Sequence, residues 1–155
     1  MTVYKFVRRT LRLNTFASAI IRGCYERRYI LGHTSRARTP SFAFRTKQAA
    51  KAHETPLRQT YGPLTLVRCT AERTERIHEA LDPSDLWKAV GHRKNVGYAQ
   101  EPLTLEEWWR LDAPERIRRS ATYRVPEDTV ACWGLTPLAI VPRKSCEITL
   151  ERRMA

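Results

Sequence analysis

Apolar and polar residues alternate along much of the first half of the chain, which is the pattern of half-buried β-strands. The alternation is clearest in VYKFVRR (3–9), SFAFRT (41–46) and LTLVRCTAE (64–72). The stretch YERRYILG (25–32) also indicates a strand, which Gly32 ends. These patterns predict a sheet whose strands come largely from the first 72 residues.

Three segments carry the signals of short helices. Thr46 is placed to cap a helix over 47–53, because its hydroxyl can accept a hydrogen bond from the first helical turn. A second helix is predicted over 82–90, where an Asp-Pro pair opens the segment and a glycine follows it. A third is predicted over 104–111, which begins with a capping box.

The order of these elements predicts the fold class. The prolines at 56 and 63 bracket a loop after the first helix, and 125–153 offers two or three further strands separated by turns. A chain of 155 residues has the length of one domain with a real core. We therefore expect an α+β fold: a compact single domain, 1–155, with a mixed or antiparallel sheet and two to three short helices.

The stretch SFAFRTKQAA (41–50) locally resembles the signature by which RNA-recognition motifs stack bases on two aromatic rings. Phe42 and Phe44 would then face solvent, and alternation along the strand would turn Arg45 inward. An unpaired buried arginine is strongly unfavourable, and the signature's other positions are not matched here. We therefore expect Phe42 and Phe44 to enter the core while Arg45 faces water.

Charge divides the chain into two halves. The net charge is +12, and residues 1–78 contain 16 Lys/Arg against 4 Asp/Glu, whereas residues 79–155 contain 12 of each. The whole excess therefore lies in the basic half, 1–78. A positive potential of this kind attracts polyanions such as nucleic acid, acidic proteins or anionic lipid.

A single phosphate-binding face is predicted within the basic half. It would combine the loop HTSRARTP (33–40) with the strand before it and the helix after it. Arginine forks and lysine ammonium groups bind phosphate oxygens without reading base sequence. The residues of the predicted face are Arg27, Arg28, Arg36, Arg38, Lys47 and Lys51.

The chain offers little material for catalysis or for a metal site. Its cysteines, at 24, 69, 132 and 146, are too widely spaced for a zinc knuckle, so we expect free thiols and no metal. The four histidines are well separated, and no nucleotide-binding loop or nucleophile motif occurs. We predict no catalytic residues and no cofactor.

The tryptophans divide by expected environment. Trp87, Trp108 and Trp133 are predicted to pack in the core. Trp109 follows Trp108 directly, and adjacent helical residues diverge by about 100°. Trp109 is therefore the candidate for an exposed anchor at a protein interface.

The overall layout is similar to that of a loose group of small uncharacterised phage and bacterial proteins. The similarity rests on the opening VYKFVRR, on FAFRTKQAAKAH (42–53) and on the turn and strand PEDTVACWGLTPLAIV (126–141). Asp128 stands where the group's turn has glycine. The resemblance implies a fold and points to a viral origin, and it implies no activity.

An ADP-ribosyltransferase-like enzyme is the catalytic alternative. Such domains use an early arginine or histidine, a Ser/Thr element and a late glutamate. Arg8 or Arg9, Thr34–Ser35, and Glu147 or Glu151 occur in a permissive order, but the chain has no paired E-x-E or Q-x-E.

No apolar run approaches the roughly 18 residues of a membrane span, and no secretory signal is evident, so we expect a cytoplasmic protein. The basic, acid-free segment 1–25 has the composition of a mitochondrial presequence, so a mitochondrial location is the alternative.

We predict a non-enzymatic basic accessory protein that binds nucleic acid or another polyanion through its basic half. A module that docks an acidic protein partner is the second reading, and the oligomeric state is left open.

Overall fold

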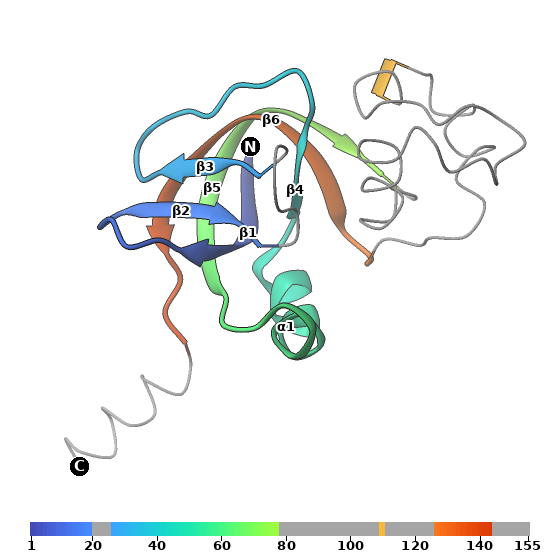
Figure 1. Ribbon diagram of the computed structural model, residues 1–155. Coiled ribbons are helices and arrows are strands. Elements are labelled where there is room, and N and C mark those ends of the chain that lie inside the picture. Colours follow the sequence, from blue (N-terminus) through green and yellow to red (C-terminus); the bar gives the residue numbers. More distant parts are fainter. Residues whose placement is uncertain (20–25, 78–108, 111–125, 144–155) are drawn as a thin grey trace, which may run out of the picture.

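The computed structural model describes residues 1–19, 26–77, 109–110 and 126–143 (Figure 1). Strands make up nearly half of this part of the chain, and one full helix accompanies them. In chain order the elements are β1 (Thr2–Arg9), β2 (Thr15–Ser18), β3 (Arg28–Ile30), β4 (Ser41–Phe44), α1 (Lys47–Tyr61), β5 (Thr65–Arg76) and β6 (Thr129–Ile140).

The strands form one antiparallel sheet that closes into a barrel. Their order is β3-β2-β1-β4-β6-β5, and β5 also pairs with β1, so that β1, β4, β6 and β5 form a closed ring. One edge of β1 is shared: Tyr4 pairs with Phe44 of β4, and Val7–Arg9 pair with β2. The predicted α+β fold with two to three short helices is therefore wrong, because the long strands β5 and β6 close the sheet on itself.

The barrel interior is filled by alternate residues of its strands. Val3 and Val7 of β1 face Val67 and Cys69 of β5, and all four belong to one buried cluster with Phe16 of β2 and Tyr29 of β3. Large side chains thus fill the ring, and it holds a packed core rather than a channel.

The two phenylalanines of β4 are shielded from solvent, but from the outside of the barrel. Ala43 points into the barrel core, so its neighbours point outward. Phe44 is buried beneath α1, where it meets Phe6 edge to face at 6.1 Å. Phe42 is half-buried against Trp109. The expected burial of Phe44 and exposure of Arg45 are confirmed. The core that Phe44 joins, however, is a second layer outside the barrel.

The predicted cap of the first helix is confirmed, whereas its predicted end is wrong. The Thr46 hydroxyl accepts a hydrogen bond from the Ala49 amide, and Ala50 is fully buried against the barrel. The helix continues through Pro56 to Tyr61, instead of giving way to a loop at Pro56. The buried apolar face and ion pairs along α1 outweigh the hydrogen bond that a proline within a helix removes.

In the region 125–153, where two or three strands were predicted, the structure describes one long strand, and residues 144–153 lie outside the described ranges. Gly134 has φ +64, a conformation open to glycine, and it lets β6 bend without ending. A Cβ at this position would lie 2.4 Å from the Glu72 carboxylate on β5. Asp128 has φ 62 in the turn before β6, a conformation that aspartate tolerates.

Several predictions concern residues outside the described ranges. These are the helix over 82–90, most of the helix over 104–111, Cys24, Cys146, Trp87, Trp108, Glu147 and Glu151. Trp109 and Arg110 are described and are helical. Within the described ranges, no helix has the length and apolar character needed to cross a bilayer.

Candidate polyanion-binding surface

An arginine and a tryptophan stack where β5 and β6 run side by side. Arg73 of β5 pairs in register with Trp133 of β6 on the outside of the barrel. The Arg73 guanidinium carbon lies 3.9 Å from the centre of the Trp133 ring, which is the geometry of a cation–π contact. The contact with the ring therefore restricts the position of the Arg73 guanidinium.

The loop between β3 and β4 brings two more arginines to this place. Ser35 forms a bridge with Leu135 of β6, and the Thr34 and Thr136 hydroxyls are 2.7 Å apart. The Trp133 indole nitrogen donates to the Arg38 carbonyl at 3.4 Å. These contacts attach the loop along β6, so that its arginines lie beside the second half of β5.

We call this the distal surface and define it by Arg36, Arg38, Arg73 and Trp133. Its three arginines are exposed to solvent. Arg36 forms an ion pair with Glu72 of β5, and both side chains are more than half exposed. An exposed pair of this kind is weak, and a stronger anion can displace its carboxylate.

Trp133 of the distal surface packs in a cluster of aromatic rings. Trp109 lies 5.9 Å from Phe42 and 5.8 Å from Trp133, between ring centres. Trp109 was predicted as an exposed anchor at an interface, and it lies half-buried in this cluster. Trp133, predicted as a core residue, lies half-buried at the surface and carries Arg73.

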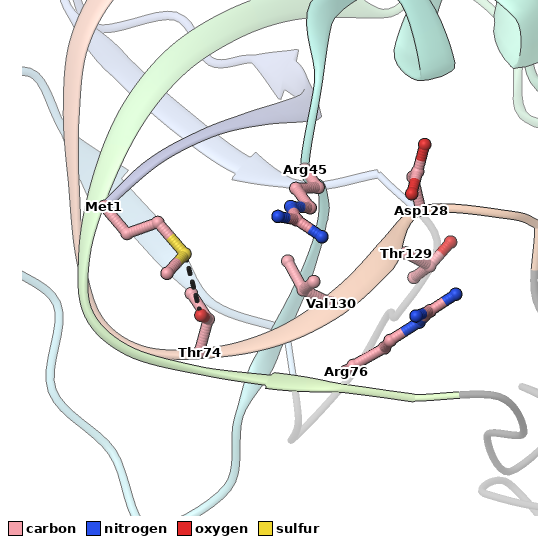
Figure 2. Close-up of a pocket in the computed structure, with 7 residues that line it drawn as sticks. All are labelled: Met1, Arg45, Thr74, Arg76, Asp128, Thr129 and Val130. Carbon is pink, nitrogen blue, oxygen red and sulfur yellow. Dashed lines mark hydrogen bonds between the residues drawn. The ribbon is translucent and has the colours of Figure 1, made fainter.

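A second pair of arginines lines a cleft at one open end of the barrel (Figure 2). A cleft of about 230 Å³ is lined there by the starts of β1 and β6 and the ends of β4 and β5. Arg45 and Arg76 lie on either side of Thr129 and Val130, and Asp128 lines the same cleft. Among the described residues, no carboxylate oxygen lies within 4.0 Å of either guanidinium.

Arg27, predicted to bind polyanions, is used inside the fold. Its guanidinium donates to the Ser41 hydroxyl at 2.9 Å and to the carbonyl and hydroxyl of Thr39. The Tyr29 hydroxyl, fully buried, is 2.7 Å from the same Ser41 oxygen. Burial lowers the pKa of the Arg27 guanidinium, although the nearby Tyr29 phenol offsets part of this.

Lys5 is a second cation whose ammonium is held by the fold. It alternates with Val3 and Val7, and its ammonium donates to the Phe42 carbonyl at 2.6 Å and lies 5.7 Å from the centre of the Tyr29 ring. The thiols of Cys69 and Cys132 lie in the same core. Burial raises the pKa of Cys69 to about 12 and of Cys132 to about 11, and the charge of Lys5 only partly opposes this.

The remaining predicted residues lie on other parts of the molecule. Arg28 is exposed on β3. Lys47 and Lys51 lie on α1, below the barrel in Figure 1, whereas the loop carrying Arg36 and Arg38 crosses its top. Lys51 is 3.8 Å from Glu54. The six predicted residues therefore do not share one face, and only Arg36 and Arg38 come together at the distal surface.

The residues of the enzyme alternative are engaged in separate structural contacts. Arg8 bonds the Ser18 carbonyl and pairs with Glu26, whereas Arg9 donates to the Thr65 hydroxyl at 3.2 Å. Thr34 and Ser35 anchor their loop on β6. Among the described residues, no three carboxylate, imidazole or thiol side chains gather closely enough to hold a metal ion.

Comparison of the chain with protein-family models, curated proteins and solved structures finds no match.

Arg73, Arg76 and Arg45 were not among the predicted site residues. For Arg73 and Arg76 the signal in the sequence is the run of charged residues at the end of β5, which favours a solvent-exposed segment. Which loop lies beside them cannot be read from that run.

Proposed function

We propose that this protein is a non-enzymatic nucleic-acid-binding protein whose distal surface contacts the phosphate backbone. The observation that carries the proposal is the Arg73 guanidinium stacked on Trp133, with Arg36 and Arg38 held beside it by the β3–β4 loop. Three guanidinium groups on two neighbouring segments suit an extended polyanion better than a single small ion.

The stacked arginine favours nucleic acid over other polyanions. Trp133 covers one face of the Arg73 guanidinium, and the arginine is exposed to solvent. A base of a single strand can stack on the guanidinium of Arg73, while Arg36 and Arg38 donate hydrogen bonds to neighbouring phosphates. Because Trp133 already orders Arg73, less side-chain entropy is lost on binding.

The electrostatics of the whole chain support the same function. The net charge of +12 raises the local concentration of any polyanion around the protein. Long-range attraction alone, however, does not distinguish one face from another. The proposal therefore requires that arginines at the distal surface matter more than equal charges elsewhere.

Two double variants test this requirement with equal changes in charge. R36A/R38A removes two positive charges from the distal surface, and K47A/K51A removes two from α1. Arg36 is ion-paired with Glu72, and Lys51 is ion-paired with Glu54. The binding of a fluorescent single-stranded oligonucleotide is measured by anisotropy at several salt concentrations.

We expect R36A/R38A to weaken binding about tenfold and to reduce the slope of log K against log salt by about 1.4, or about 0.7 for each lost phosphate contact. K47A/K51A should change both quantities much less. Equal effects of the two variants, or binding that does not depend on salt, would reject the proposal. Capture of an acidic protein that survives nuclease treatment would assign the distal surface to the alternative, a protein partner.

A further inference from the structure

The turn between β1 and β2 holds two leucines fully out in solvent. Leu11 and Leu13 have relative exposures of 107% and 90%, the highest among the exposed large apolar side chains of the described residues. Single exposed leucines are common on protein surfaces and need no explanation. Two of them at the tip of one hairpin, with nearly their whole surface in water, are a different case. We call residues 10–14 the hairpin tip.

The hairpin tip is fixed by hydrogen bonds. The Thr10 amide and hydroxyl both donate to the Thr15 carbonyl, at 3.2 and 3.1 Å, and the Thr15 amide donates to the Arg12 carbonyl at 3.3 Å. Asn14 closes the turn with φ 58, which asparagine tolerates. The Leu31 amide of the neighbouring strand donates to the Asn14 carbonyl at 2.9 Å. The backbone therefore presents both leucines in a set position.

Positive charge surrounds these leucines. Arg12 lies between them and Arg9 stands at the end of β1, and both are exposed. Residues 1–25 contain no acidic residue, and the first one along the chain, Glu26, is ion-paired with Arg8. Ile30, next to the turn, adds a third exposed apolar side chain. The tip is thus apolar at its end and cationic around its base.

From this arrangement we infer that the hairpin tip docks the protein on an anionic lipid membrane, with Leu11 and Leu13 entering the acyl boundary. Arg9 and Arg12 then meet the phosphate and carboxylate groups of the lipid head groups. Cations next to an anionic leaflet and apolar side chains at the interface both favour the bound state.

A membrane fits this tip better than a protein partner does. The tip is narrow and projects from the barrel at the left edge of Figure 1. A stable protein interface buries on the order of 1,000 Å² or more, which two leucines do not provide. A bilayer needs only that side chains enter it, and the charge of the tip is complementary to its surface.

The inference does not depend on the proposed nucleic-acid function. The hairpin tip belongs to β1 and β2, whereas the distal surface belongs to β5, β6 and the β3–β4 loop. The two surfaces share no residue, so each can be removed without the other.

Co-sedimentation with lipid vesicles tests the inference on the full chain. Vesicles of phosphatidylcholine alone are compared with vesicles that also contain phosphatidylserine, for the wild type and for L11S/L13S. We expect the wild type to sediment with the phosphatidylserine vesicles and L11S/L13S to bind them at least about tenfold more weakly. R12A should weaken binding more than K47A, which removes the same charge from α1.

Controls separate docking from folding and from the other surface. Because both leucines are exposed, L11S/L13S should keep the wild-type melting temperature and oligonucleotide affinity. A tryptophan introduced as L13W should be quenched by brominated lipids beyond the quenching of the wild type. Failure of the wild type to bind phosphatidylserine vesicles, or equal binding by L11S/L13S, would overturn the inference. So would a wild-type dimer that L11S/L13S converts to a monomer, because the tip would then be a contact between copies.

Discussion

The barrel core and the distal surface use arginines from the same basic half of the chain in opposite ways. Arg27 donates to Thr39 and Ser41 beside a buried tyrosine, so its charge serves to fasten the start of β4. The Arg73 guanidinium carbon lies 3.9 Å from the centre of the Trp133 ring, and the side chain is exposed to solvent, where a ligand can reach it. Arg27 therefore stabilises the fold, whereas Arg73 can contact a ligand.

This difference shows that net charge overstates the binding capacity of a basic protein. The count of +12 includes the Arg27 guanidinium and the Lys5 ammonium, which are held within the fold. Arg8 is ion-paired with Glu26, and this pair adds nothing to the net charge. Arg36 is paired too, but at the surface, where a competing anion can take the place of its carboxylate. The position of each cation therefore matters more than their sum.

Replacing neighbouring arginines gives the largest contrast between a cation held within the fold and an exposed one. Arg27→Ala should lower the free energy of unfolding by about 2–3 kcal/mol, because charge-assisted hydrogen bonds within the fold are lost. Arg28→Ala, one residue along, should change it by less than about 0.5 kcal/mol because Arg28 is exposed. Urea denaturation measures both. Equal losses would mean that Arg27 is not the structural cation described above.

The buried thiols predict a loss of stability at alkaline pH. Burial raises the pKa of Cys69 to about 12, whereas an unfolded thiol has a pKa of about 8.5. The unfolded state therefore releases its proton first, and stability that is complete below about pH 8.5 is lost as the pH rises toward 12. Between about pH 8 and pH 10, Cys69 should cost about 2 kcal/mol.

Cys69→Ala provides the control for this pH dependence. The variant should be less stable overall, because it leaves a cavity, but its free energy of unfolding should fall less steeply between these two pH values. Urea denaturation at each pH gives the comparison. A slope identical to that of the wild type would show that the Cys69 thiol ionises in the folded protein.

Replacing one carboxylate at the distal surface should have the smallest effect on stability and binding. Glu72→Gln keeps the side-chain shape over Gly134 but removes the charge that pairs with Arg36. Stability should change by less than about 0.5 kcal/mol, and oligonucleotide binding should tighten about threefold at low salt. Glu54→Gln on α1 removes the same charge elsewhere, and it should leave binding nearly unchanged. Tightening by both variants would point to overall charge alone.

Local patterns predicted individual elements better than their arrangement. The strands at VYKFVRR and LTLVRCTAE and the cap at Thr46 are confirmed, because alternation and capping are properties of short segments. The end of α1 was wrong, because Pro56 was given more weight than the packing of the helix on the barrel. Between residues 126 and 143 the chain forms one strand, because Gly134 bends β6 rather than ending it, and the rest of the predicted strand region lies outside the described residues.

The candidate site was only partly accessible to sequence reasoning. Arg36 and Arg38 were predicted from their composition and do lie together. Arg73 was missed because its partner Trp133 is 60 residues away in the chain, and the register of β5 with β6 brings them together. Arg27 was predicted as available, because nothing near it in the sequence reveals that the residues at 39 and 41 accept its hydrogen bonds.

A reader of the sequence alone can predict a basic first half, mostly extended segments and one capped helix, because charge and periodicity are local properties of the chain. The three-dimensional fold is needed to see that the sheet closes, that β4 faces two cores, and which cations remain open to a ligand. Closure and availability depend on which distant segments pair. Pairing between distant segments is set by packing and register across the whole barrel rather than by any one stretch.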